Sequence, residues 1–231
     1  MKFSRHHWVI AISLIVVILL AGYGVCQKWP RLFNKYSGLT TTLEIQMDDT
    51  TRILVQQRLA TTQASINASL AKGEKPEMNL YLTLAEYERL SGNLIASREN
   101  YETYLALNPA SYVAHKAYAT VLDIMGDYSK AEPEFKAALD GLKTEEYYRD
   151  YAEFLATRYP DRTDDYKAVI EEAFVNLGQT TWTMLTLGDW YFAHNDCEQG
   201  RQHYAVAKAL APDQAEQITS DSEEKDAACT K

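Results

Sequence analysis

Cysteine is scarce in this chain of 231 residues, which holds only Cys26, Cys197 and Cys229. None of them belongs to a C-x-x-C pair or to a C-x-x-C-H haem attachment site, which argues against a cysteine-based redox centre. Cys197 and Cys229 could form a disulfide if the domain faces an oxidising compartment, or they could be two unrelated thiols. The sequence leaves both alternatives open.

Motifs for catalysis and ligand binding are also missing. The histidines have no spacing that would place two metal ligands on one helix face, and no Gly-rich loop could hold a phosphate. The serine and cysteine side chains lack a recognisable base to activate them. His194, Asp196 and Cys197 lie close together in the sequence, but we expect a turn there. We therefore predict no catalytic residue, no metal site and no cofactor.

Basic residues are too few in most of the chain to balance the acidic ones. Residues 1–36 contain five basic side chains and no acidic one, whereas residues 37–231 contain 18 basic and 32 acidic side chains, a formal net charge of −14. A domain with this charge repels a phosphate backbone, so we expect no nucleic-acid partner. A basic protein partner is compatible with it, because complementary charge raises association rate and specificity.

One long apolar segment is present near the N-terminus. Residues 8–25 read WVIAISLIVVILLAGYGV and hold no charge. As a helix they would span roughly 27 Å, close to the thickness of the hydrocarbon core of a bilayer. We predict a short tail at 1–7, a transmembrane signal anchor at 8–26 and a linker at 27–47. A cleavable signal peptide is the alternative, whereas Tyr23 and Val25 argue against lipid attachment at Cys26.

The orientation of this anchor is predicted from its short N-terminal tail. Basic residues flank the apolar segment on both sides, so charge alone gives almost no preference. A seven-residue tail without a fold of its own usually stays in the cytoplasm, and the long domain then crosses the membrane. We therefore expect a single-pass protein of a bacterial-type inner membrane, with its domain in the periplasm.

A first helix is predicted over residues 48–73. Asp48 or Asp49 is suited to cap its N-terminus, because a short carboxylate accepts hydrogen bonds from the unpaired N–H groups of the first turn. Gly73 is suited to the residue after its C-terminus, and Pro76 bars continuation.

Four landmarks then recur at a spacing of 34 residues: a turn glycine, a small residue, an aromatic residue and a leucine. They are Gly92 and Gly126, Ser97 and Ala131, Tyr101 and Phe135, and Leu105 and Leu139. Self-similarity at this period is typical of helix–turn–helix repeats. The stretch Leu187-Gly188-Asp189-Trp190-Tyr191 adds a further copy of the pattern.

Residues 78–214 resemble the tetratricopeptide repeat family in about four units, of which the third is degenerate. Its first helix is predicted at 145–158, before a lengthened turn at 159–162. The resemblance implies an all-α fold, a right-handed superhelical solenoid, here preceded by one transmembrane helix. After Pro212 we expect a short helix, and we expect the rest of an acidic tail at 215–231 to fray.

The landmark residues have packing roles in such units. Small residues allow the two helices of a unit to cross, and Gly92, Gly126 and Asn195 suit a left-handed backbone conformation in the turn between them. Asp127 is expected to cap the helix that follows its turn. Pro133 lies inside that helix and should shift its start or bend it.

The resemblance also implies a concave groove, lined by the first helix of each unit, that binds a peptide or helix of a partner. Carried over unit by unit, its lining is Asn79, Leu82, Glu86 and Arg89; Lys116, Thr120 and Asp123; Arg149 and Glu153; and Trp182, Leu185, Asp189 and Phe192. The family's carboxylate clamp is not implied, because Thr120 and Glu153 stand where asparagine would be needed. Lys116 and Arg149 beside the last group could hold an acidic, hydrophobic segment, although a merely solvated face is the alternative.

These features favour a membrane-anchored adaptor whose partner is a protein or peptide. An accessory subunit of an extracytoplasmic assembly machine, for example in cytochrome maturation, is a second hypothesis. An enzyme is the least favoured, because no catalytic constellation is present. The sequence identifies neither the partner nor the oligomeric state.

Overall fold

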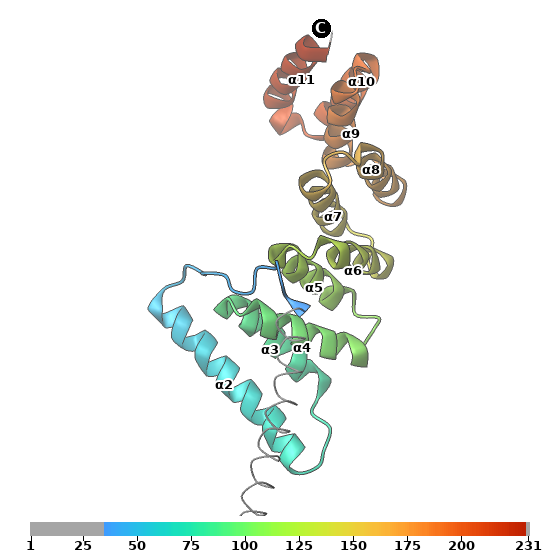
Figure 1. Cartoon of the computed structure of the whole chain (residues 1–231). Coiled ribbons are helices and arrows are strands. Elements are labelled where there is room, and N and C mark those ends of the chain that lie inside the picture. Colours follow the sequence, from blue (N-terminus) through green and yellow to red (C-terminus); the bar gives the residue numbers. More distant parts are fainter. Residues whose placement is uncertain (1–34, 230–231) are drawn as a thin grey trace, which may run out of the picture. The chain divides into compact units, whose positions relative to one another are not determined.

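The computed structural model describes residues 35–229, and Figure 1 shows its helices. The chain forms two compact parts, residues 1–41 and 42–231, and every helix named below belongs to the second part. Among the described residues no helix is both long and apolar enough to cross a membrane. The predicted tail 1–7 and signal anchor 8–26 lie outside the described residues.

The first long helix, α2 (Asp49–Ala71), begins and ends as predicted. The Asp48 carboxylate accepts a hydrogen bond from the backbone N–H of Thr51 at 2.9 Å, which satisfies one unpaired donor of the first turn. Gly73 has a left-handed backbone with a φ of 74° and follows the helix, so both predicted caps are confirmed.

Four helix pairs follow, here called units 1 to 4, and each helix packs on its neighbours in sequence. They are α3 (Met78–Ser91) with α4 (Leu94–Leu107), α5 (Tyr112–Met125) with α6 (Tyr128–Gly141), α7 (Glu145–Arg158) with α8 (Thr163–Leu177), and α9 (Thr181–Ala193) with α10 (Cys197–Leu210). The helices of unit 2 begin and end 34 residues after those of unit 1, as the spacing predicts. The lengthened turn of unit 3 is also present between α7 and α8.

Small residues do lie where the two helices of a unit cross. In unit 1 Ala85 and Ser97 are fully buried, and the Ser97 hydroxyl donates a hydrogen bond to the Ala85 carbonyl at 2.8 Å. In unit 4 a Cβ on Gly188 would lie 2.6 Å from the ring of Tyr204. A larger residue at that position would push α9 and α10 apart, which confirms the predicted packing role.

The turn of unit 1 has a second role that the sequence did not indicate. Gly92 has the expected left-handed backbone, with a φ of 84°, but its carbonyl also accepts a hydrogen bond from the N–H of Leu43 at 2.9 Å. Thr42 and Asn93 form an isolated antiparallel bridge. A Cβ on Gly92 would lie 1.9 Å from the carbonyl oxygen of Leu43. The end of the predicted linker is therefore fastened to unit 1.

One prediction about α6 is wrong, and one alternative of a second prediction is excluded. Asp127 makes no capping hydrogen bond; its carboxylate instead accepts one at 2.9 Å from the guanidinium of Arg98, a side chain of α4 with 0% exposure. A buried charge needs such a partner far more than an exposed helix end needs a cap. Pro133 lies inside a continuous helix that starts in register with α4, so it does not shift the helix start.

The Arg98–Asp127 ion pair joins units 1 and 2, and the junction between units 2 and 3 has an equivalent pair with its charges reversed. Glu132 of α6 stands 34 residues after Arg98, and it accepts hydrogen bonds at 2.8 and 3.0 Å from Arg162, the residue that precedes α8. Stacking α8 directly on α4 would therefore bring Arg162 to Arg98. This reversal disfavours a wrong order of units by repulsion between like charges.

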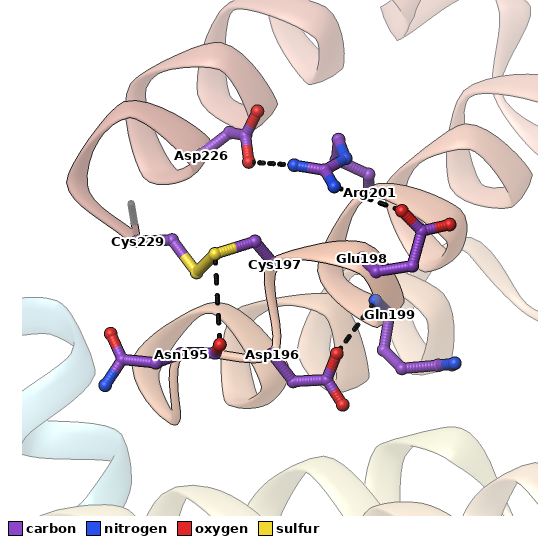
Figure 2. The surroundings of a disulfide bond; sticks show 8 residues. All are labelled: Asn195, Asp196, Cys197, Glu198, Gln199, Arg201, Asp226 and Cys229. Carbon is purple, nitrogen blue, oxygen red and sulfur yellow. Dashed lines mark hydrogen bonds and ion pairs between the residues drawn. A yellow bond between two sulfur atoms is a disulfide. The ribbon is translucent and has the colours of Figure 1, made fainter. Parts of the chain in front are cut away.

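Residues 215–229 are helical rather than frayed, which corrects the prediction for this part of the tail. After a short 3₁₀ turn, Pro212–Gln214, helix α11 (Ala215–Cys229) packs on α10 and α9. A disulfide joins Cys197, the first residue of α10, to Cys229, and their Cα atoms lie 5.8 Å apart (Figure 2). Arg201 and Asp226 form an ion pair at 2.6 Å beside it. The pairing that the sequence left open is thus present in this structure.

Candidate partner-binding groove

A pocket of about 310 Å³ lies between the first helices of units 2 and 3. Its walls come from residues spaced by three, four or seven along α5 and α7, which the helical period places on one face of each helix. They are Lys116, Thr120 and Asp123 of α5, and Asp150, Glu153, Phe154, Thr157 and Arg158 of α7, with Phe135 of α6 below. We call this pocket the α5–α7 groove.

Ion pairs between α5 and α7 bridge the α5–α7 groove. The guanidinium of Arg158 donates to both carboxylate oxygens of Asp123, at 2.7 and 3.1 Å, and this hydrogen bonding raises the pKa of Arg158. The ammonium of Lys116 lies 2.9 Å from Asp150 and also contacts Glu146. Burial by itself would lower the pKa of Lys116, but the hydrogen bonds to these carboxylates outweigh it and raise the pKa. Both basic side chains are therefore neutralised within the fold.

Glu153 has a different environment. It is exposed, and it has no hydrogen-bond or ion-pair partner among residues 35–229. Lys116 and Arg158, the basic side chains of the same lining, are both taken up by other carboxylates. Glu153 is thus the one carboxylate of the lining whose charge the described fold leaves uncompensated.

The corresponding carboxylates of units 1 and 4 are held by a tyrosine of the second helix. The Tyr101 hydroxyl donates to Glu86, and the Tyr204 hydroxyl donates to Asp189. Burial and the neighbouring carboxylate raise the pKa of Tyr204 to about 12, so its hydroxyl remains a donor at neutral pH. We call this arrangement the tyrosine lock.

Units 2 and 3 lack the tyrosine lock. At the two positions of the lock, unit 2 has Thr120 and Phe135, and unit 3 has Glu153 and Ile170. Neither Phe135 nor Ile170 carries a hydroxyl. The α5–α7 groove therefore lies where the lock is missing.

The other residues predicted for the groove are distributed along units 1, 3 and 4. Asn79 is exposed and Leu82 half-buried, and Arg89 pairs with Glu86 at 3.1 Å. The guanidinium of Arg149 lies 5.2 Å from the ring centre of Trp182, as the sequence suggested, but it also pairs with Glu145 at 2.8 Å. Leu185 is half-buried. These residues do not join the α5–α7 groove.

Two residues of the last predicted group lie beside α11. Asp189 and Phe192 line a separate pocket of about 440 Å³ with Lys225, Ala228 and Cys229 of α11. Phe192 is only 5% exposed, and the ammonium of Lys225 contacts the Asp189 carboxylate. Asp189 and Phe192 therefore line a pocket beside α11 and not the α5–α7 groove. The sequence-based emphasis on α9 as the main recognition helix stays a prediction.

Several lining residues were missed by the sequence analysis: Phe135, Asp150, Phe154, Thr157 and Arg158. The family resemblance gives one register of positions on each first helix, and Asp150 and Phe154 lie one residue beyond Arg149 and Glu153 of that register. The spacing of four between Asp150, Phe154 and Arg158 was the available signal, since it places them on one face of α7.

No metal-binding arrangement of His, Cys, Asp and Glu side chains occurs within residues 35–229. His194, which the sequence places near Asp196 and Cys197, stacks on the Trp190 ring with centres 3.8 Å apart. Cys197 is in the disulfide, and the Asp196 carboxylate accepts from the N–H of Gln199 (Figure 2). These side chains are thus engaged in the turn before α10.

No protein-family model and no curated protein matches the sequence. Solved structures resemble the chain at low sequence identity. One is a crystal structure of MamA, 12% identical, with a TM-score of 0.55, covering 74% of this chain and 99% of that one. Another is the C-terminal part of a tetratricopeptide repeat-containing protein from Cytophaga hutchinsonii, 15% identical, with a TM-score of 0.54 and 77% of each chain covered.

A third similar structure is YrrB, described as a tetratricopeptide repeat protein with an unusual peptide-binding site. It is 14% identical, with a TM-score of 0.50, and the match covers 73% of this chain and 88% of that one. At such identities the likeness establishes the fold alone. The fold of this chain is accordingly an all-helical solenoid of the tetratricopeptide type.

Proposed function

We propose that this protein is a membrane-anchored interaction scaffold that binds a segment of a partner protein in the α5–α7 groove. The observation that carries the proposal is the groove itself, a pocket of about 310 Å³ between two units whose lining is mostly charged and polar and includes two phenylalanines. Such a surface offers several polar contacts in fixed positions, which suits recognition of a peptide or helix.

Rigidity of the groove favours this function. The Arg158–Asp123 and Lys116–Asp150 pairs hold side chains of α7 against those of α5. A groove that is already ordered loses little conformational freedom when a partner binds, so more of the contact energy contributes to affinity. Binding therefore requires no rearrangement of the units in this proposal.

The membrane anchor and the periplasmic location belong to the same proposal. The uncharged apolar segment at 8–25 supports an anchor, and the Cys197–Cys229 disulfide supports an oxidising compartment. An anchored groove meets partners of the same membrane at a raised effective concentration, which strengthens a contact of modest intrinsic affinity. The partner is a protein or peptide at or near that membrane.

Site-specific photo-crosslinking tests the groove. A photoreactive amino acid replaces Thr157 of the α5–α7 groove in one variant and Val175 of α8, which is 79% exposed, in a control variant. We expect a discrete crosslinked partner from position 157 and none from position 175. Thr157→Trp, which fills the groove, should lower the yield from a photoreactive residue at Thr120. Equal crosslinking from 157 and 175 would contradict the proposal.

Membrane fractionation tests the anchor and its orientation. We expect the full chain to resist extraction of membranes by alkaline carbonate, because a hydrophobic span is not released by breaking ionic contacts. Protease added to spheroplasts should digest residues 37–231 and leave a short membrane-protected fragment. A chain that carbonate releases, or a domain that protease reaches only after the inner membrane is opened, argues against this part of the proposal.

A further inference from the structure

Units with the tyrosine lock and unit 3, which lacks it, differ in the hydrogen-bond partner of one carboxylate. In units 1 and 4, Glu86 and Asp189 receive a hydrogen bond from a tyrosine of the same unit. In unit 3 the carboxylate is kept at Glu153, but the tyrosine is replaced by Ile170. The carboxylate thus remains at a place where its internal partner is absent, on the wall of the α5–α7 groove.

The charges around Glu153 indicate which sign of charge a ligand of the groove should carry. Three acidic and two basic side chains line it, and both basic ones are engaged by Asp123 and Asp150. The residual charge of −1 therefore belongs to Glu153. An acidic ligand would have to break one of these ion pairs or face Glu153 directly, and each alternative is unfavourable. A basic ligand meets an uncompensated carboxylate without disturbing any pair.

We propose that the α5–α7 groove selects a partner segment that carries a lysine or arginine side chain, and that this side chain pairs with Glu153. The proposal rests on the proposed function and gives the chemistry of the partner. Asp150 stands one helical turn before Glu153 on α7 and is paired with Lys116, so Glu153 is the carboxylate of this face that remains for the incoming cation.

This assignment replaces the sequence-based hypothesis of an acidic, hydrophobic partner segment. That hypothesis assumed that Lys116 and Arg149 were available to an anion. Lys116 contacts Glu146 and Asp150, and Arg149 pairs with Glu145. The two cations are therefore occupied, and Glu153 is the charge left for a partner.

The test is a selection of binders from a random library of twelve-residue peptides, with the detergent-solubilised full chain as the target. Three forms are compared: the unchanged protein, Glu153→Lys and Glu224→Lys. Glu224 is an exposed residue of α11 outside the groove, so its substitution changes the net charge by the same amount. Circular dichroism verifies that the three forms are folded. One selected peptide is then labelled and its affinity measured against all three forms and against Glu153→Gln.

The expected result is enrichment of Lys or Arg at one peptide position with the unchanged protein and with Glu224→Lys. Glu153→Lys should lose this enrichment and gain Asp or Glu there. Glu153→Gln should weaken the labelled peptide about fivefold, the effect of one partly exposed ion pair. Enrichment that is absent, or that Glu153→Lys leaves unchanged, overturns the inference.

The outcomes also separate this inference from the proposed function. In one outcome, selected peptides crosslink to a photoreactive residue at position 157 and yet show no preference for basic residues. This result overturns the charge selection and leaves the groove as a binding site. Peptides that crosslink only outside the α5–α7 groove, or a library that yields no binder, overturn both proposals. Glu153→Lys and Glu224→Lys could also weaken the preference for basic peptides equally. That result would show that the preference reflects the net charge of the domain, and it would overturn the role of Glu153.

Discussion

Units 1 and 4 hold the tyrosine lock between their two helices, whereas units 2 and 3 do not. The same outer units are also closed by further segments. Residues 42–43 are fastened to the turn of unit 1, and α11 is joined to unit 4 by a disulfide. The middle units have no such cover, and the α5–α7 groove lies between them. With the proposed function, closure and binding thus belong to different parts of one repeat array.

This division follows from what a repeat array requires. Each unit buries its apolar faces against its neighbours, so the two terminal units would expose a face that has no neighbour. Here α2 covers unit 1 and α11 covers unit 4. The middle units are covered on both sides by the array itself. Their groove-facing positions are therefore free to carry side chains chosen for a partner.

The largest effect is expected when the disulfide that closes unit 4 is removed. Cys197→Ser combined with Cys229→Ser should lower the free energy of unfolding by about 3 to 4 kcal/mol, because the crosslink no longer restricts the unfolded chain. Ile218 is the only buried apolar side chain of α11 besides Cys229, so α11 has few other contacts. Amide hydrogen exchange should accelerate throughout α11. Cys26→Ser is the control, and unchanged exchange in α11 would contradict the account.

The closure of unit 1 is tested by a pair of alanine substitutions at equivalent turn glycines. Gly126→Ala should cost about 1 to 2 kcal/mol, since the left-handed backbone disfavours a Cβ while no atom lies within 4 Å of it. Gly92→Ala should cost about 3 kcal/mol, because its Cβ also collides with the Leu43 carbonyl. Denaturant unfolding measures both. Equal losses would show that the contact of residues 42–43 adds no stability.

The junction of the middle units is tested through pH. Hydrogen bonds from Arg162 first, and then from Lys136, lower the pKa of Glu132 from 4.5 to about 2. The ionised form is favoured in the folded state, so its contribution is present above pH 4.5 and is lost as the pH falls towards 2. Glu132→Gln should reduce stability by about 1 to 2 kcal/mol at pH 7. The loss should shrink between pH 4.5 and 2; a loss independent of pH would contradict this assignment.

The smallest effect is expected when the tyrosine lock is introduced into unit 2. Phe135→Tyr places a hydroxyl near the groove and Thr120→Glu supplies a carboxylate, which reproduces the residues of unit 1. In a double-mutant cycle we expect a favourable coupling of about 1 kcal/mol, because the two groups form a charge-assisted hydrogen bond only together. Thr120→Gln with Phe135→Tyr is a matched control, because it has the same length as Thr120→Glu and lacks the charge. Strict additivity would show that the units are not interchangeable at these positions.

The sequence predicted the helices well because their signals are local. A glycine or asparagine in the turns of units 1, 2 and 4, a small residue where helices cross and a spacing of 34 recur along the chain, and each acts within one unit. Asp127 was misassigned for the opposite reason. Its true partner, Arg98, is 29 residues away and lies in another unit, so no local pattern connects the two.

The candidate site was predicted only in part. Lys116, Thr120, Asp123 and Glu153 were identified because the family resemblance gives the face of each first helix that lines the groove. Which of them remains available to a partner depends on ion pairs across units. Asp189 and Phe192 were assigned to the groove on the same grounds, but they line a separate pocket beside α11, whose acidic sequence gave no sign of its packing on unit 4.

The sequence by itself therefore determined the repeat, the helix boundaries, the turn residues and the acidic character of the domain. These depend on backbone preferences, on periodic burial and on composition, all of which can be read along a single chain. Only the tertiary structure decided that the outer units are closed, that Cys197 meets Cys229 and that Glu153 lacks an internal partner. Each of these depends on distances between residues far apart in the chain, which packing alone sets.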